Sequence, residues 1–275
     1  MKTNPKFKFI SWGGGLQSTC MAVMSALGDL PKVDAVINSD PGFESQENYK
    51  SIAWYLAWLN RHGLHTEVIY PENNIKLDFI NNHIHIPVWT QTGAPLTRQC
   101  TQHYKLIPTK RRYREIAGYH PVNPPHPYPG EFEIWIGFTL DEHERRSKSR
   151  KKYMVNRWPL IELGMTRDHC IDYLQSHGLP IPPKSACVIC PYRRAKDWIY
   201  IRDHSPEDWK QAVLIDKQVR HARPLANVTS DSVYLYRGLV PLDQANLEAD
   251  AAAYESRQKG AAHQIIICDG GSCWT

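Results

Sequence analysis

Long hydrophobic runs are missing from this 275-residue sequence, and none approaches the ~20 apolar residues that a membrane-spanning helix needs. The first residues, MKTNPKFKFISW, are basic but lack the apolar stretch and small residues of a signal peptide. We therefore expect a cytoplasmic protein with no membrane partner. Thiols stay reduced in the cytosol, which excludes a disulfide framework, so the seven cysteines need another explanation.

Neither sign of charge dominates strongly. The net charge of +5 at pH 7 permits a polyanionic partner without requiring one. With 42% hydrophobic residues and this length, the chain can bury a full core. One α/β domain with an appendage is the expected organisation.

The first ~70 residues alternate between strand-like and helix-like segments. Apolar runs predict strands over 7–11, 33–39 and 65–70, and amphipathic patterns predict helices over 19–27 and 48–61. This alternation predicts a parallel, Rossmann-like sheet with right-handed crossovers.

The rest of the chain adds one more strand and then becomes helical. A basic helix is predicted over 99–117, and a strand over 132–138 follows a proline-rich loop. Helices dominate from Thr166 onward. We therefore expect an α/β nucleotide-binding domain over 1–165 and a helical extension over 166–275.

A glycine-rich loop, SWGGGLQST, joins the first strand to the first helix. Glycines let backbone N–H groups turn toward a phosphate or sulfate, and the start of the helix adds partial positive charge. Ligands bind at the carboxyl ends of parallel strands, where this loop lies. A tight turn without a ligand is the alternative interpretation. The candidate nucleotide contacts are Ser11, Gly13, Gly14, Gly15, Gln17 and Ser18.

Charged residues outside this loop are further candidates. Asp40 closes the second strand and could contact ribose or adenine, or could simply form a turn before Pro41 and Gly42. Lys105 could place a cation near a bound anion. The basic runs over 105–114 and 145–152 fit solvated surfaces, or sites that bind the phosphates of a nucleotide or nucleic acid.

The cysteines form the strongest local motif. Cys187 and Cys190 are spaced so that two thiolates converge on one metal, and Pro191 follows. A redox disulfide and chance are the alternatives for this pair alone. Both zinc and a [4Fe–4S] cluster need four ligands, and the remaining candidates are Cys100, Cys268 and Cys273. Because a second CxxC pair is missing, the arrangement favours iron–sulfur, with zinc as the lesser option. Cys20 and Cys170 lie on apolar helix faces, so we expect them in the core.

The glycine loop resembles the PP-loop pattern Ser-Gly-Gly-x-Asp-Ser, with Gly13 at the first serine and Gln17 at the acidic position. With glutamine at this position, the loop resembles that of phosphoadenosine phosphosulfate (PAPS) reductases. Bacterial proteins described as members of the PAPS reductase family share six blocks in the same order. These blocks are SWGGGLQST, RQCTQHYKLIP, WIGFTLDEHERR, NRWPLIELGMTR, PPKSACVICPY and CDGGSCWT. The last block departs from the reductase tail Glu-Cys-Gly-Leu-His.

The resemblance implies a PP-loop domain of the adenine nucleotide alpha hydrolase-like superfamily. It implies a [4Fe–4S] cluster whose ligands are Cys100, Cys187, Cys190 and Cys268. It also implies a sulfonucleotide reductase, in which the Cys273 thiolate attacks the sulfur of PAPS or adenylyl sulfate (APS). A thioredoxin-like reductant would then release sulfite.

Two other functions stay open at this stage. One is an ATP pyrophosphatase that uses ATP with Mg to adenylate tRNA or DNA and inserts sulfur with the help of the cluster. The other is a non-catalytic nucleotide-binding module with structural zinc. The sequence also leaves open which of Cys268 and Cys273 is ligand and which is nucleophile, and whether the protein forms a homo-oligomer.

Overall fold

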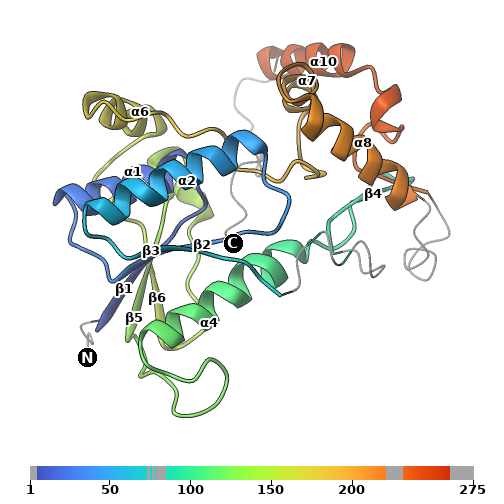
Figure 1. Cartoon of the computed structure of the whole chain (residues 1–275). Coiled ribbons are helices and arrows are strands. Elements are labelled where there is room, and N and C mark those ends of the chain that lie inside the picture. The colour runs from blue at the N-terminus through green and yellow to red at the C-terminus, as the bar shows by residue number, and fades with distance from the viewer. Residues whose placement is uncertain (1–4, 73–74, 76–77, 79–84, 221–231, 261–275) are drawn as a thin grey trace.

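A five-stranded parallel sheet forms the centre of the N-terminal part of the chain (Figure 1). The computed structural model describes residues 5–72, 75, 78, 85–220 and 232–260. The strand order is β3-β2-β1-β5-β6, and every neighbouring pair in it is parallel. The strands are β1 (Phe7–Ser11), β2 (Ala35–Ser39), β3 (Thr66–Ile69), β5 (Phe132–Ile136) and β6 (Met154–Arg157). The predicted α/β class with a parallel sheet is confirmed.

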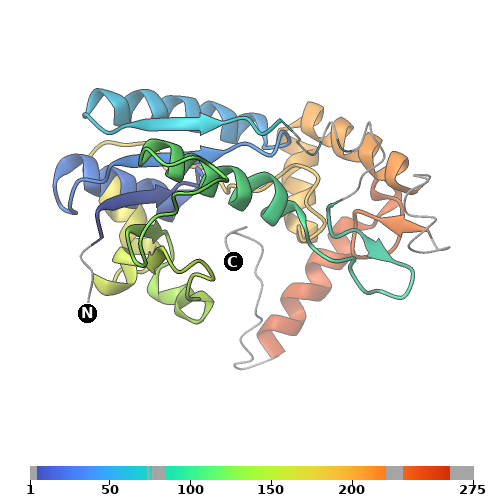
Figure 2. The same cartoon turned by 90° about the horizontal axis from the view of Figure 1, so that it is seen from below.

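Helices cover both faces of this sheet because successive residues of each strand point to opposite sides. On one face, Ile10, Val36 and Trp135 pack in a first core with α1, α2, α5 and α6. On the other face, Phe9, Ile37 and Ile134 pack in a separate core with α4. The helices are α1 (Leu16–Leu27), α2 (Gln46–Arg61), α4 (Ile107–Ile116), α5 (Pro159–Glu162) and α6 (Arg167–Ser176). Figure 1 shows α4, in green, on the face opposite α1 and α2, and in Figure 2, seen from below, α4 lies in front of the sheet.

Cys20 and Cys170 lie in the first core, fully buried, as predicted. Cys20 is on α1 and Cys170 on α6. A hydrogen bond to Cys170, together with burial, raises the pKa of the Cys20 thiol far above its usual range. The Cys20 thiol therefore stays protonated. Both cysteines act as core residues.

A helical lobe lies beside the sheet rather than over it (Figure 1). We use this name for residues 188–220 and 232–260, which share one further core with Val88 and Tyr104. A small antiparallel pair joins β7 of the lobe to β4, which lies much earlier in the chain. Its elements are α7 (Ala195–His204), α8 (Pro206–Arg220), η3 (Leu242–Gln244) and α10 (Leu247–Gly260), with β4 (Trp89–Thr90) and β7 (Val233–Tyr234).

Several boundaries differ from the sequence prediction. The first helix begins at Leu16, earlier than predicted, because Gly15 is its N-cap. The basic helix predicted as one element is a π-helix, η1 (Thr101–Leu106), followed by α4. The sequence analysis also missed β6, an edge strand of which only Met154 is buried. The tail with Cys268 and Cys273 lies outside the described residues.

No helix in the described ranges is long and apolar enough to cross a membrane.

Candidate functional site

The glycine loop between β1 and α1 depends on Gly14. Its φ of +73° lies in the left-handed region that favours glycine. A Cβ atom built on Gly14 would also lie 2.7 Å from Cγ1 of Ile52 on α2. Both the backbone conformation and the packing therefore require glycine at this position.

The hydroxyl groups of the loop hold the loop itself. Ser18 Oγ accepts the N–H of Gly13 at 3.2 Å and donates to the carbonyl of Gly15 at 3.3 Å. Thr19 Oγ1 accepts the indole N–H of Trp12 at 2.9 Å. Asn38 Nδ2, at the end of β2, donates to the carbonyl of Trp12 at 2.8 Å. Ser18 therefore stabilises the turn that presents the backbone.

The start of α1 has open hydrogen-bond donors. Gly15 is the N-cap, and no side chain of the described residues caps this helix. Within the same residues, no acceptor bonds the backbone N–H groups of Gly14, Gly15, Leu16 or Gln17. The first turn carries no acidic residue. Unpaired N–H groups and the helix dipole at the start of a helix favour the binding of an anion, so this turn can supply such contacts.

The segment after β5 closes one side of the loop. A Cβ atom on Gly137 would lie 2.7 Å from the backbone nitrogen of Ser18, so this close approach requires glycine. Glu142, in η2 (Leu140–Arg145), accepts from Gln17 Nε2 at 3.0 Å and pairs with Arg145 at 2.5 Å. The sequence analysis did not name Gly137 or Glu142, although both belong to the block WIGFTLDEHERR.

Asp40 forms the turn before Pro41 and Gly42, which is one of the two roles considered for it from the sequence. Its Oδ1 accepts the N–H of Gly42 at 2.7 Å and the hydroxyl of Tyr49 at 3.0 Å. Burial raises the pKa of the Asp40 carboxyl above its usual value, against the lowering effect of these hydrogen bonds. Its Oδ2 has no hydrogen bond within the described residues and stays available to a ligand.

Lys105 is buried and pairs with Glu44, which follows β2. The Lys105 Nζ to Glu44 Oε1 distance is 3.1 Å, and both residues are 5% exposed. Glu44 Oε2 also accepts from Asn48 Nδ2 at 2.8 Å. Asn48 is fully buried, and its Oδ1 has no partner among the described residues. A buried pair like this one needs its hydrogen bonds to offset desolvation, so Lys105, Glu44 and Asn48 form one unit.

The CxxC segment lies directly against this unit and the glycine loop. Ser185 Oγ donates to the carbonyl of Gly13. Cys187 forms a β-bridge with Glu44, and the N–H of Val188 donates to the carbonyl of Phe43 at 2.7 Å. The contacts therefore bring together a loop and a cysteine motif that are more than 150 residues apart in sequence.

Cys187 and Cys190 lie at the two ends of a tight turn. The N–H of Cys190 donates to the carbonyl of Cys187 at 3.1 Å. The buried guanidinium of Arg193 holds this turn through the carbonyls of Ala186, at 2.7 Å, and Cys187, at 3.0 Å. Both cysteines are half-buried. Two thiols on a fixed turn fit the soft donor set of an iron–sulfur cluster or zinc.

Cys100 lies at the N-terminus of η1, and its N–H donates to the carbonyl of His85 at 2.9 Å. Cys100 packs against the same core as Cys187. The pKa of the Tyr104 hydroxyl is raised chiefly by burial and by the hydrogen bond to Asp78, and the nearby Cys100 raises it further. In the described ranges, no three Cys, His, Asp or Glu residues gather as a metal site. The predicted ligands Cys268 and Cys273 lie outside these ranges, so the complete ligand set stays a prediction.

Comparison with known proteins gives no family for this chain. No model of a known protein family matches it, and no curated protein matches it. The function is therefore inferred from the residues and their contacts.

Proposed function

We propose that this chain binds an adenine nucleotide at the glycine loop and carries out sulfur chemistry on it with the neighbouring cysteines, as a PAPS-reductase-like enzyme of PP-loop type. One observation carries the proposal. The uncapped start of α1 is joined to the CxxC segment through the Ser185–Gly13 hydrogen bond and the Cys187–Glu44 bridge.

The glycine loop supplies the anion site of this proposal. The backbone N–H groups of Gly14 to Gln17 bind the phosphate or sulfate, and the dipole of α1 stabilises its charge. Gln17 presents a neutral amide at the position where PP-loop pyrophosphatases carry an acid. Gln17 donates to Glu142, and Arg145 forms an ion pair with the same carboxylate. The Glu142 carboxylate therefore leaves no net negative charge beside the anion.

The cysteines supply the rest of the site. Cys187 and Cys190, with Cys100 and a tail cysteine, would hold a [4Fe–4S] cluster, which when bound stabilises the site structurally and electrostatically. The thiolate of Cys273 attacks the sulfur of PAPS or APS, so an S–S bond forms and the S–O bond to the nucleotide breaks. The nucleotide leaves through its phosphate oxygen. A thiol of a thioredoxin-like reductant then attacks the Cys273 sulfur, releases sulfite and becomes part of a mixed disulfide, which a second thiol resolves.

Sulfite release is the direct test. The full chain, reconstituted anaerobically, should release sulfite from PAPS or APS when a dithiol reductant is present. Cys273→Ser should abolish release and leave nucleotide binding unchanged, because the thiolate acts only in the chemical step. An absence of sulfite from both nucleotides would refute the reductase reaction.

A second candidate function has an observation of its own. The pKa of Lys110, on α4, is lowered by burial and by the nearby charges of Lys151 and Arg150. Like charges gathered this way fit a surface that binds a phosphate backbone. This favours the alternative of an ATP pyrophosphatase that adenylates tRNA or DNA for sulfur insertion. Pyrophosphate release from ATP and Mg that depends on added tRNA or DNA would support this function against the first.

A further inference from the structure

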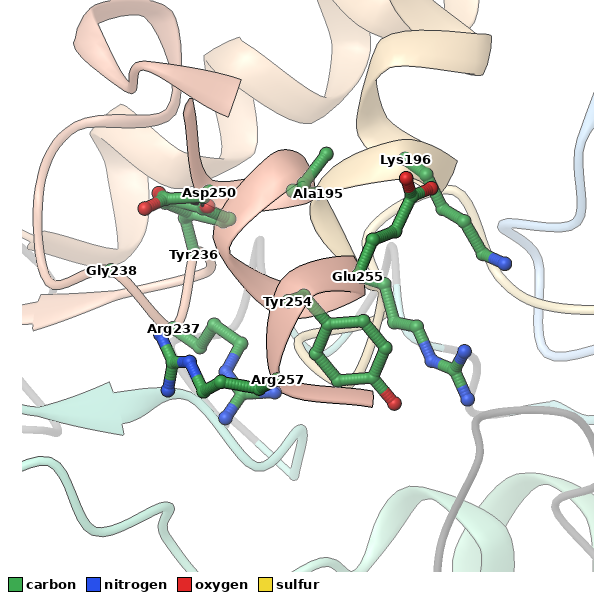
Figure 3. Close-up of a pocket in the computed structure, with 11 residues that line it drawn as sticks. Ala195, Lys196, Tyr236, Arg237, Gly238, Asp250, Tyr254, Glu255 and Arg257 are labelled. Carbon is green, nitrogen blue, oxygen red and sulfur yellow. Dashed lines mark hydrogen bonds between the residues drawn. The ribbon is translucent and has the colours of Figure 1, made fainter. Parts of the chain in front are cut away.

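A cavity of about 410 Å³ lies in the helical lobe, away from the glycine loop. Three segments enclose it: the start of α7, the turn after β7 and the second half of α10 (Figure 3). Its volume falls in the range of small-molecule sites. Arg194 lines it and directly follows Arg193, the residue that holds the CxxC turn. The cavity is therefore connected in sequence to the candidate site but is separate from it.

The charge of the cavity lining is positive. Arg194, Lys196, Arg237 and Arg257 face Asp250 and Glu255. Asp250 already accepts the hydroxyl of Tyr236 at 2.5 Å. In the view of Figure 3, Arg237 and Arg257 project to one side of α10, and Asp250 and Glu255 lie toward the other. One end of the cavity is thus rich in guanidinium groups.

Two of these guanidinium groups, those of Arg237 and Arg257, pair with no carboxylate in the part of the chain that the structure describes. Within the described residues, the side chains of Arg237, Arg257 and Lys196 form no ion pair with Asp or Glu. Arg237 instead lies over the ring of Trp89, 5.9 Å from its centroid. Planar guanidinium groups bind phosphate with two parallel hydrogen bonds, so this end of the cavity suits a phosphate group.

An aromatic surface lies next to the cations. Tyr254 lines the cavity, and Arg194 Cζ lies 5.0 Å from the centroid of its ring. In the view of Figure 3, the Tyr254 ring, like Arg237 and Arg257, lies below Asp250 and Glu255. Aromatic rings beside arginines are the usual surfaces on which nucleobases stack while their phosphates bind cations. The backbone at the start of α7 adds its positive dipole end to the same wall.

The turn that carries Arg237 is fixed in place by Asp216 of α8. This carboxylate is fully buried and accepts the N–H groups of Leu235 at 2.9 Å and Leu242 at 3.0 Å. Arg220 pairs with the same carboxylate. Because both ends of the turn are held, Tyr236 and Arg237 line a preformed cavity.

We propose that this cavity is a second anion site that takes a nucleoside phosphate, with its phosphate on Arg237 and Arg257 and its base against Tyr254. The ligand is either a free mononucleotide or one nucleotide of a single strand of nucleic acid. This inference does not depend on the function proposed for the glycine loop. It adds a site at which a nucleic acid or a second nucleotide meets the protein close to the CxxC turn.

Binding to the full chain tests the proposal with two probes. One is fluorescently labelled AMP, and the other is a labelled, 5′-phosphorylated single strand of about ten nucleotides. The double variant Arg237→Gln/Arg257→Gln should bind at least about tenfold more weakly whichever probe the wild type binds. This is the cost of losing one charge-assisted contact. Equal binding of both probes identifies a free nucleotide as ligand, and binding of the strand alone identifies nucleic acid.

Matched variants separate this site from the glycine loop. Lys210→Gln/Lys217→Gln removes two exposed charges of the same lobe outside the cavity, and its binding should equal that of the wild type. Arg237→Lys/Arg257→Lys should restore part of the lost affinity, which a folding defect would not allow. Gly14→Ala should leave the cavity site unchanged. The proposal is wrong if neither probe binds, or if the Gln variant binds as the wild type does.

Discussion

The first turns of α1 and α2 lie close together, yet the chain builds them in opposite ways. In α2, Ser45 caps the helix by accepting the N–H of Asn48 at 3.2 Å, and Glu47 adds a negative charge to the first turn. In α1, Gly15 takes the cap position without a side-chain bond from the described residues, and no acid follows. The α6 start matches α2, with Thr166 as cap and Asp168 in the first turn.

This difference distinguishes a structural helix start from a binding one. A side-chain cap contributes about 1 kcal/mol relative to alanine, and glycine at the cap position costs about a few tenths of a kcal/mol. In α1 that cost accompanies a left-handed glycine and a close approach by Gly137. The N–H groups that caps satisfy in α2 and α6 have no side-chain cap from the described residues in α1, as the proposed anion site requires.

The largest effect is expected from Gly14→Ala. The added methyl group would lie 2.7 Å from Ile52, and alanine disfavours the positive φ of this position, so the loop must shift. Adenine nucleotide affinity, measured by titration calorimetry, should fall at least about tenfold, the equivalent of 1.4 kcal/mol. Gly28→Ala, at the other end of α1, is the control. Its φ of +94° causes similar strain, but nothing lies within 4 Å, so only stability should fall. Equal affinities for the two variants would refute the role of the loop.

The next prediction gives α1 the cap that α2 has. Gly15 has φ −90° and ψ 173°, which suit a side-chain cap, and its Cβ would have ordinary contact with Ser185 at 3.4 Å. Gly15→Asp should weaken nucleotide binding several-fold, because its carboxylate takes the N–H groups and repels the anion. Gly15→Asn has the same shape without the charge and should weaken binding less. Binding in Gly15→Asp as strong as in the wild type would contradict an anion site here.

Removal of a structural cap should have a different consequence. Thr166→Ala deletes the cap of α6 and should lower the free energy of unfolding by about 1 kcal/mol, as measured by chemical denaturation. Nucleotide affinity should not change, because α6 packs on α1 through buried core residues such as Cys170 and Leu174 and not through the N–H groups of the first turn of α1. If Thr166→Ala lowered nucleotide affinity without lowering the free energy of unfolding, the proposed difference between the two kinds of helix start would be wrong.

The smallest effect concerns Asp40, at the edge of the site. Burial raises its pKa in the folded protein, so the folded state binds this proton more tightly than the unfolded chain. Its contribution is complete below the unfolded pKa of about 3.9 and is lost as the pH rises through the folded value. Relative to Asp40→Asn, the wild type should therefore lose stability as the pH rises from about 4 through the raised pKa of the folded state. Chemical denaturation of both proteins at a series of pH values checks this prediction. A wild type that gains stability relative to Asp40→Asn as the pH rises would contradict the sign.

Sequence patterns predicted the sheet because its buried strands are short and strongly apolar. The strands Phe7–Ser11 and Ala35–Ser39 have little exposed surface, so their periodicity reports the fold. The edge strand Met154–Arg157 escaped prediction because three of its four residues are not buried. The π-helix at Thr101–Leu106 escaped because its hydrogen bonding depends on contacts such as Ser39 to the carbonyl of Tyr104.

For the site, the sequence predicted the residues that are unusual in type but not those that connect them. The glycines and the CxxC pair are recognisable by themselves. Glu44, Asn48 and Ser185 are ordinary residues whose importance comes from burial or from partners more than 60 residues away. Such long-range pairing has no local pattern. The functions of Cys268 and Cys273 stay predictions.

Protection of the CxxC thiols by a nucleotide tests the central claim most directly. The chelator-treated, reduced full chain is alkylated in the presence and absence of APS, and labelling at each cysteine is followed by mass spectrometry. Nucleotide in the glycine loop should slow labelling of Cys187 and Cys190 in the wild type, and Gly14→Ala should need at least about tenfold more nucleotide for the same protection. Unchanged labelling of these thiols at saturating nucleotide would show that the loop and the cysteines do not form one site.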